Sequence, residues 1–213
     1  MAHRREFIKK ATIGSIGITT LYACSKGLEK EQKREAAKTV KKPLIISTWN
    51  HGLPANEEAF KQLKKGESAL NAIVAGVGIP EADPKERSVG YGGLPDRDGY
   101  VTLDACIMDH NSNCGSVSFL QDIKHPIAVA KKVLQETPHV MLSGKGAQDF
   151  ALSKGFVKEN LLTSESEKDW KDWIKKSNYK PVINIENHDT ISMLILDEDG
   201  NLSSVMKWRL VYD

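Results

Sequence analysis

The chain has 213 residues, with 30 basic and 28 acidic side chains and a formal net charge of +2. This length accommodates one domain, or half of a larger two-layer domain. The near balance of charge excludes an electrostatic nucleic-acid surface, which needs a clustered excess of Lys and Arg. Three cysteines are too few for a disulfide scaffold, and the six histidines form no Cys/His cluster with metal-ligand spacing. The sequence contains no Gly-rich phosphate loop, so neither a metal nor another cofactor is expected.

The N-terminus has the organisation of an export signal, which we assign to residues 1–24. A charged start, residues 3–10, precedes the weakly apolar residues 11–23 and then Cys24. The apolar stretch is shorter than the roughly 20 residues that span a bilayer. The pair at positions 4 and 5 resembles the arginine pair of twin-arginine signals. We therefore expect export to the periplasm, or anchoring to a membrane by lipid.

The residues before Cys24 resemble a bacterial lipobox, in which the cysteine receives a lipid and becomes the first residue. Tyr22 stands where a small or β-branched residue is typical, so the alternative is a plain signal peptide with an incidental cysteine. Residues 25–42 are rich in Lys and Glu and hold almost no large apolar side chain. Because such a segment cannot bury enough surface to offset its ordering entropy, it is predicted to be a solvated tether. A short charged helix is the alternative.

From residue 43 onward the apolar pattern predicts strands and helices that mix without a strict βαβ rhythm. The predicted strands are 44–48, 101–108, 115–120, 139–142, 190–196 and one from 202; the predicted helices are 57–65 (capped by Asn56), 68–77, 126–136, 146–154 and one after the capping box Ser164/Glu167. In the last helix, Trp170 and Trp173 are expected to anchor the core. The fold class is therefore mixed α and β, with sheets sandwiched by helix layers.

The most informative segment lies around Thr190, where polar residues 184–189 run directly into an apolar strand. His188-Asp189-Thr190-Ile191 at the head of that strand resembles the processing site of the glycosylasparaginase (aspartylglucosaminidase) family of N-terminal-nucleophile hydrolases. The resemblance extends over about residues 43–189. It is carried by Gly92-Gly93-Leu94-Pro95-Asp96-Arg97-Asp98-Gly99, Thr102-Leu103-Asp104-Ala105, Ile107-Met108-Asp109, Thr137-Pro138-His139-Val140-Met141-Leu142 and Asn160-Leu161-Leu162-Thr163.

This resemblance implies an α/β (α+β) fold, the four-layer αββα sandwich of that superfamily, present here only in part. Residues 43–189 would correspond to the α subunit and residues 190–213 to a truncated start of the β subunit. After Ser204 the tail departs from the family pattern. The family keeps its substrate-carboxylate ligands, its oxyanion donors and a Thr that binds the nucleophile in the part that would follow.

The resemblance also implies a chemistry. Thr190 would attack the carbonyl of Asp189, and cleavage would free an N-terminal amine that activates the Thr190 hydroxyl. The freed Thr190 would then hydrolyse the side-chain amide of a glycosylated asparagine. His188 would shape the bend before the cleaved bond; its alternative is a polar residue that caps the strand. Trp49 would line the substrate pocket, with core packing as the alternative for an isolated Trp.

Several alternatives remain open at the level of sequence. The sister branch, isoaspartyl peptidase or plant-type asparaginase, shares the fold and the nucleophile, but its junction resembles Gly-Thr, whereas here His188-Asp189 precedes Thr190. The product could also be a non-catalytic envelope lipoprotein. The tail is compatible with a frameshifted or decayed gene product, with a fragment of a reading frame, or with a short protein that recruits a missing half or a homodimer partner. On this basis the chain is expected to be inactive by itself.

The two remaining cysteines have no role in this resemblance. Cys106 lies among apolar residues and is most simply a small buried hydrophobe. Cys114 follows eight residues later, and an export compartment would permit a disulfide between them without requiring one.

Overall fold

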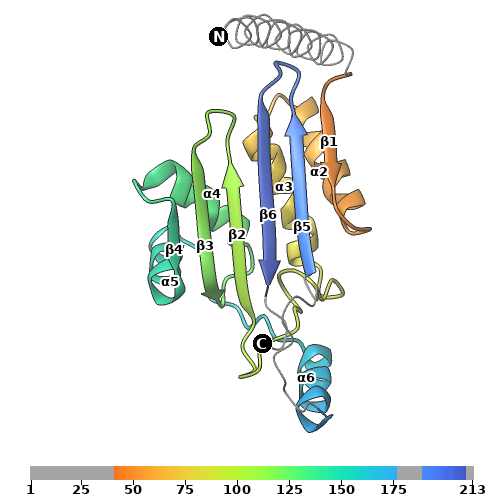
Figure 1. The fold of residues 1–213 in the computed structure, drawn as a ribbon, viewed down its shortest axis with the longest axis vertical. Helices are drawn as coiled ribbons and strands as arrows, with labels where there is room; N and C mark the ends of the chain where they lie inside the picture. Colours follow the sequence, from red (N-terminus) through yellow and green to blue (C-terminus); the bar gives the residue numbers. More distant parts are fainter. Residues whose placement is uncertain (1–40, 177–188, 210–213) are drawn as a thin grey trace, which may run out of the picture. The chain divides into compact units, whose positions relative to one another are not determined.

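The computed structural model describes residues 41–176 and 189–209. In this part the chain forms one six-stranded sheet with the strand order β1-β5-β6-β2-β3-β4 (Figure 1). The strands are β1 (Leu44–Ser47), β2 (Thr102–Met108), β3 (Cys114–Gln121), β4 (Met141–Ser143), β5 (Asp189–Leu196) and β6 (Leu202–Arg209). The helices are α2 (Gly52–Lys64), α3 (Ala69–Ala82), α4 (Pro126–Glu136), α5 (Gly144–Ser153) and α6 (Ser164–Lys176). The predicted mixture of α and β structure is confirmed.

The sheet is mixed, because β3 and β4 run parallel while every other neighbouring pair is antiparallel. Strand β5 lies between β1 and β6, and its register places Ile195 opposite Ile45 and Ile191 opposite Lys207. Although the tail after Ser204 departs from the family pattern, it forms a regular strand paired on both sides. Residues 205–209 therefore belong to an interior strand of the sheet.

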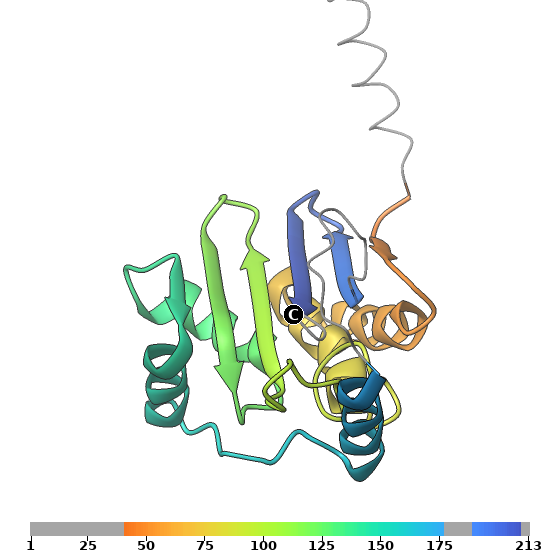
Figure 2. The same ribbon diagram turned by 60° about the horizontal axis from the view of Figure 1, so that its bottom comes forward.

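One face of the sheet is covered by helices. Helices α2, α3 and α4 lie behind the strands in both views (Figures 1 and 2), with α2 and α3 behind β1, β5 and β6 and α4 behind β2 and β3. Successive strand residues point to opposite faces, and in β5 the residues Ile191, Met193 and Ile195 are buried beneath these helices. This alternation places the hydrophobic core between the sheet and the helix layer.

No helix of the described residues covers the other face, which we call the open face. Its strands present large apolar side chains that are 40–55% exposed: Leu44, Ile46, Met108, Met141, Leu194, Leu202 and Met206. The register places Ile46 opposite Leu194, and it places Leu202 opposite the half-buried Leu196. Apolar patches of this kind on a folded chain mark a surface that another element covers.

Several element boundaries differ from those predicted. Helix α2 begins at Gly52, so Asn56 lies inside it and does not cap it. Helix α3 continues to Ala82 through Pro80, which sits in the last turn. Strand β4 is shorter than predicted because the hydroxyl of Thr137 accepts a hydrogen bond from the His139 amide (3.1 Å) and holds the preceding residues in a turn.

Helix α6 differs in its cap and its packing. Thr163, not Ser164, caps it: the Thr163 hydroxyl accepts a hydrogen bond from the Ser166 amide (3.3 Å). The prediction that Trp170 and Trp173 anchor the core is wrong. Both are only partly buried, and the Trp170 indole N–H donates to the carbonyl of Arg97 (3.2 Å). The helix packs on the loop before β2. The helical spacing of Trp170 and Trp173 therefore marks a face that contacts this loop, and not a face of the main core.

Of the helices in the described ranges, none combines the length and the apolar character that a membrane span requires.

Two glycines of α3 provide a matched test of the helix packing. A Cβ at Gly76 would lie 2.5 Å from the carbonyl oxygen of Ala55 and 3.0 Å from the Cβ of Ala59, whereas a Cβ at Gly78 meets nothing closer than 3.8 Å. Gly76→Ala should lower the free energy of unfolding by about 1–3 kcal/mol, because it forces α2 away from α3. Gly78→Ala should raise it by about 0.5–1 kcal/mol through helix propensity. Urea unfolding measures both, and equal effects of the two substitutions would contradict this packing.

Candidate active site

Thr190 is the second residue of β5 and lies at one end of the sheet. Its register partner on β6 is Trp208, which in turn pairs with Asp104 on β2. The Thr190 side chain is partly buried. Because β5 and β2 both start at this end and β6 ends there, the loops that could contribute to a site at Thr190 meet at the same edge (Figure 1).

The Thr48 side chain fastens the start of β5 to the end of β1. Its hydroxyl donates to the carbonyl of Thr190 (3.2 Å) and accepts a hydrogen bond from the Ser192 amide (3.0 Å). The Thr48 amide donates to the carbonyl of Ser192 (3.0 Å), which extends the β1–β5 ladder beyond Ser47. A side chain that bridges two backbone groups of the neighbouring strand holds the Thr190 backbone in place. No local sequence pattern predicts this contact, since Thr48 and Thr190 are 142 positions apart.

Trp49 follows directly and has an unusual backbone conformation. Its φ angle is 62°, the left-handed region that bulky residues rarely occupy. The carbonyl of Trp49 accepts a hydrogen bond from the Gly52 amide (3.1 Å), and the side chain is 66% exposed. An indole that is two-thirds exposed is not packed in a core, so the core-packing alternative is wrong for the described chain. Strained, exposed residues of this kind concentrate at functional sites.

The other sequence-predicted site residues are placed less fully. Asp189 begins β5 and pairs with Arg209 on β6. His188 lies outside the described residues, as does the candidate lipidation site Cys24. The structure therefore brings together the end of β1, with Thr48 and Trp49, and the start of β5, with Asp189 and Thr190.

Sequence reasoning missed the polar pair of His51 and Glu86, in which His51 follows Trp49 by two positions. His51 Nδ1 lies 3.2 Å from Glu86 Oε2, with the two side chains only 13% and 23% exposed. The other oxygen of Glu86 accepts a hydrogen bond from the Ser88 amide (3.2 Å). His51 Nε2 is buried, and none of the residues that the structure describes forms a hydrogen bond with it. The pair connects the start of α2 to the loop before β2. Because the two residues are 35 positions apart, no local motif predicts their contact.

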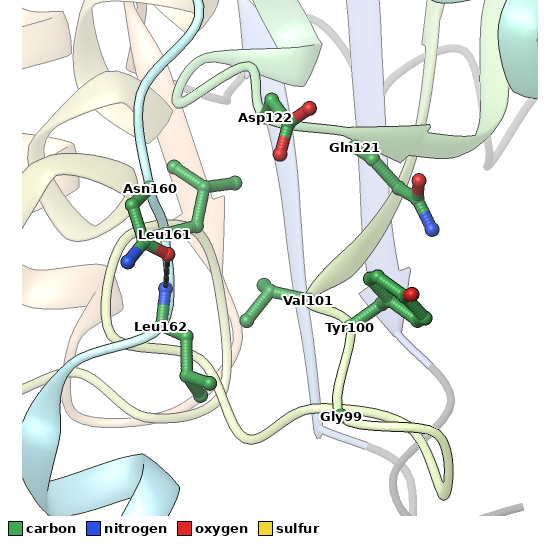
Figure 3. A pocket seen from close by; sticks show the side chains of 8 residues that line it. All are labelled: Gly99, Tyr100, Val101, Gln121, Asp122, Asn160, Leu161 and Leu162. Atoms are coloured by element: carbon green, nitrogen blue, oxygen red, sulfur yellow. Dashed lines mark hydrogen bonds between the residues drawn. The ribbon is translucent and has the colours of Figure 1, made fainter.

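A pocket of about 270 Å³ opens at the same end of the sheet, where β2 begins and β3 ends (Figure 3). Tyr100, Gln121, Asp122 and Asn160 line it together with apolar residues, among them Val101 and Leu161. The Asn160 side-chain oxygen accepts a hydrogen bond from the Leu162 amide (3.1 Å) and is thereby held in the loop. The pocket is built on β2 and β3 and Thr190 on β5, so this pocket is separate from the nucleophile.

Within residues 41–176 and 189–209 no group of three or more His, Cys, Asp and Glu side chains is placed to hold a metal ion. The polar groups shown in contact with the start of β5 are the Thr48 hydroxyl and backbone amides and carbonyls. Such groups can carry out acyl-transfer chemistry by hydroxyl attack and proton transfer.

Comparison with known proteins agrees with this chemistry. A sequence model of the family described as asparaginase matches residues 37–205. A protein of Elizabethkingia miricola named N4-(β-N-acetylglucosaminyl)-L-asparaginase is 59% identical over 203 residues, which cover 94% of this chain and 58% of that protein. Proteins of the same name from Rattus norvegicus and Mus musculus are 34% and 33% identical over 76% of this chain and 56% of their own length. The chain thus spans a little over half the length of these relatives. It belongs to the asparaginase family of N-terminal-nucleophile amidohydrolases.

Proposed function

We propose that this chain carries the nucleophile of an enzyme that hydrolyses the side-chain amide of glycosylated asparagine. The observation that carries the proposal is the junction of β1 and β5. There the Thr48 hydroxyl binds the carbonyl of Thr190 and the amide of Ser192, and Trp49 is exposed with a left-handed backbone. The substrate follows from the name of the relatives, above all the Elizabethkingia miricola protein, with 59% identity.

In the proposed mechanism the chain is first cut between Asp189 and Thr190. The Thr190 hydroxyl attacks the carbonyl carbon of Asp189, the C–N bond breaks, and water hydrolyses the resulting ester. The new N-terminal amine of Thr190 then accepts the proton of its own hydroxyl, which makes that oxygen a competent nucleophile at neutral pH. Attack on the substrate amide releases the glycosylamine, and water releases aspartate from the acyl-enzyme. His188 would shape the backbone before the cleaved bond, and Trp49 would cover one side of the substrate.

The open face supports a four-layer αββα arrangement for the complete enzyme. Its seven apolar side chains, 40–55% exposed, would pack against a second sheet contributed by the rest of the protein or by a partner chain. We further propose that residues 1–24 direct export, that residues 25–42 form a tether, and that Cys24 carries a lipid anchor. These three proposals depend on the sequence pattern of the first 42 residues.

The sister branch is the second candidate. It would use the same nucleophile on β-aspartyl dipeptides or free asparagine. The residues before Thr190 favour the glycosylated substrate, because His188-Asp189 precedes the nucleophile here, whereas the junction of the sister branch resembles Gly-Thr. A non-catalytic envelope lipoprotein is the third candidate and predicts no turnover in any form.

One experiment separates these candidates. The part of the Elizabethkingia miricola protein that runs from the position aligned with Val205 to its end is fused after Ser204, so that β6 and the domain are complete, and the product is incubated with a fluorogenic aspartyl-glucosaminyl amide. We expect cleavage before Thr190 and release of the fluorophore, with both lost in Thr190→Ala. Faster hydrolysis of a β-aspartyl dipeptide would assign the sister branch. A folded but inactive fusion would leave the chain as a scaffold.

A further inference from the structure

Two cysteine side chains meet on the open face of the sheet. The sulfur atoms of Cys106 on β2 and Cys114 on β3 lie 3.4 Å apart. The ladder pairs Cys106 with Ser116 and Cys114 with Met108, so the two cysteines are diagonal neighbours on adjacent strands. Diagonal neighbours on one face of a sheet are within reach of each other's side chains. Both side chains are partly exposed, and neither is disulfide-bonded in this structure.

The hairpin between the two strands fixes this register. The Asp109 carboxylate accepts hydrogen bonds from the amides of Asn111 and Asn113 (each 2.9 Å) and from the side-chain amide of Asn113 (2.9 Å). Desolvation would raise the pKa of Asp109, but these hydrogen bonds hold it below its ordinary value, so the carboxylate stays charged and the turn stays closed. The Asp109 amide also donates to the carbonyl of Asn113 (3.0 Å). A tightly held turn leaves β2 and β3 no freedom to slide, and the sulfurs remain close.

We propose that Cys106 and Cys114 form a dithiol site that is oxidised to an intramolecular disulfide by thiol–disulfide exchange. A disulfide bond is about 2.05 Å long, so the sulfurs need to approach by about 1.4 Å, through rotation about the Cα–Cβ bonds together with a small local change of the backbone. The co-reactant is a disulfide, either on a protein oxidant or in a small molecule such as oxidised glutathione. This site is independent of Thr190, which lies on β5.

The exchange balances in two steps. The Cys114 thiolate attacks one sulfur of the oxidant and expels its other half as a thiolate, leaving a mixed disulfide on Cys114. Cys106 then loses its proton to solvent and attacks the Cys114 sulfur, which forms the Cys106–Cys114 bond and expels the second thiolate. Two thiols are oxidised and one disulfide is reduced to two thiols. Burial, together with the neighbouring Cys114 thiol, raises the pKa of Cys106 to about 11, despite a hydrogen bond with Ser116 that lowers it. Cys106 therefore keeps its proton near neutral pH, which assigns the first attack to Cys114.

The test uses the 213-residue chain with Cys24→Ser, which leaves Cys106 and Cys114 as its two cysteines. The reduced protein is equilibrated with oxidised glutathione, quenched with acid and weighed by mass spectrometry. We expect the chain to lose two hydrogens without gaining glutathione, because the second cysteine resolves the mixed disulfide at once. The matched variant Cys106→Ser should instead retain one glutathione, whereas Cys114→Ser, which leaves only the protonated Cys106, should gain glutathione far more slowly.

The position of the bond is checked by cleavage between the two cysteines. No Lys or Arg separates them, but Met108 does, so cyanogen bromide places Cys106 and Cys114 on different fragments. In the oxidised chain these fragments should stay joined until a reductant is added. If the two-cysteine chain retains glutathione as Cys106→Ser does, or if it forms covalent dimers in place of the internal bond, the two thiols only share a hydrogen bond and the proposal is wrong.

Discussion

The 213-residue chain, purified by itself, should remain one polypeptide, with no fragment that begins at Thr190. Its hydrolysis of the aspartyl-glucosaminyl amide should be at least about a thousandfold slower than that of the fusion described above, since loss of a single oxyanion donor already costs about a hundredfold or more. Intact mass spectrometry and the fluorogenic assay measure the two quantities.

The geometry at the junction explains this expectation. Attack by a threonine hydroxyl on the preceding carbonyl needs a strained peptide that its surroundings hold in place. Here Asp189 and Thr190 are both paired in the regular β5–β6 ladder, opposite Arg209 and Trp208. No helix of the described residues covers the open face, so the β5–β6 ladder and the Thr48 hydroxyl are the restraints shown on this bond. A regularly paired peptide has no positioning advantage for the reaction.

Two controls make the result decisive. Thr190→Ala in the fusion should abolish both cleavage and turnover, which links them to the same hydroxyl. Thr48→Val in the fusion removes the hydroxyl that binds the Thr190 carbonyl and should slow cleavage, whereas Thr48→Ser should preserve it. Spontaneous release of a fragment that starts at Thr190 from the 213-residue chain would show that this half of the domain suffices.

Glu81→Ala should lower the free energy of unfolding by about 3–5 kcal/mol, because it removes one member of a buried ionic group. The Glu81 and Lys207 side chains are both 0% exposed, and their charged atoms lie 4.0 Å apart. The second oxygen of Glu81 lies 3.1 Å from His125 Nδ1, and the first accepts a hydrogen bond from the Ile127 amide (3.3 Å). The carboxylate therefore joins α3 to the start of α4 and to β6.

Urea unfolding measures this effect. The slope of the free energy of unfolding against urea concentration should stay the same, so that a shift of the midpoint reports a change in stability. The informative control is the double variant Glu81→Leu with Lys207→Met, which replaces the buried charges by apolar groups of similar size. It should recover most of the lost stability, since well-packed apolar replacements of buried ion pairs are often neutral. A loss below about 1 kcal/mol for Glu81→Ala would mean that Lys207 is satisfied without this carboxylate.

The sequence alone determined the features that depend on local periodicity. The dense apolar run 190–196 predicted β5, and Pro126 at the first position of a helix predicted the start of α4; both are confirmed. The order of motifs also indicated the family to which the chain belongs. Local patterns are sufficient here because the period of apolar residues reflects the backbone geometry of each element. The apolar residues on both sides of β5, with Leu194 on the open face, also fit a strand that the complete fold covers twice.

Contacts between distant segments were decided only by the tertiary structure. The hydroxyl of Thr48 meets Thr190 because β1 pairs with β5, although the two strands lie at opposite ends of the described sequence. Lys207 lies after Ser204, where the sequence no longer follows the family pattern. No periodicity of the sequence predicts that its side chain is buried against Glu81. Trp170 carried the spacing of a core residue but contacts a surface loop. In each case the partner is set by strand order and helix docking, which depend on the packing of the whole sheet and are not encoded in the spacing of neighbouring residues.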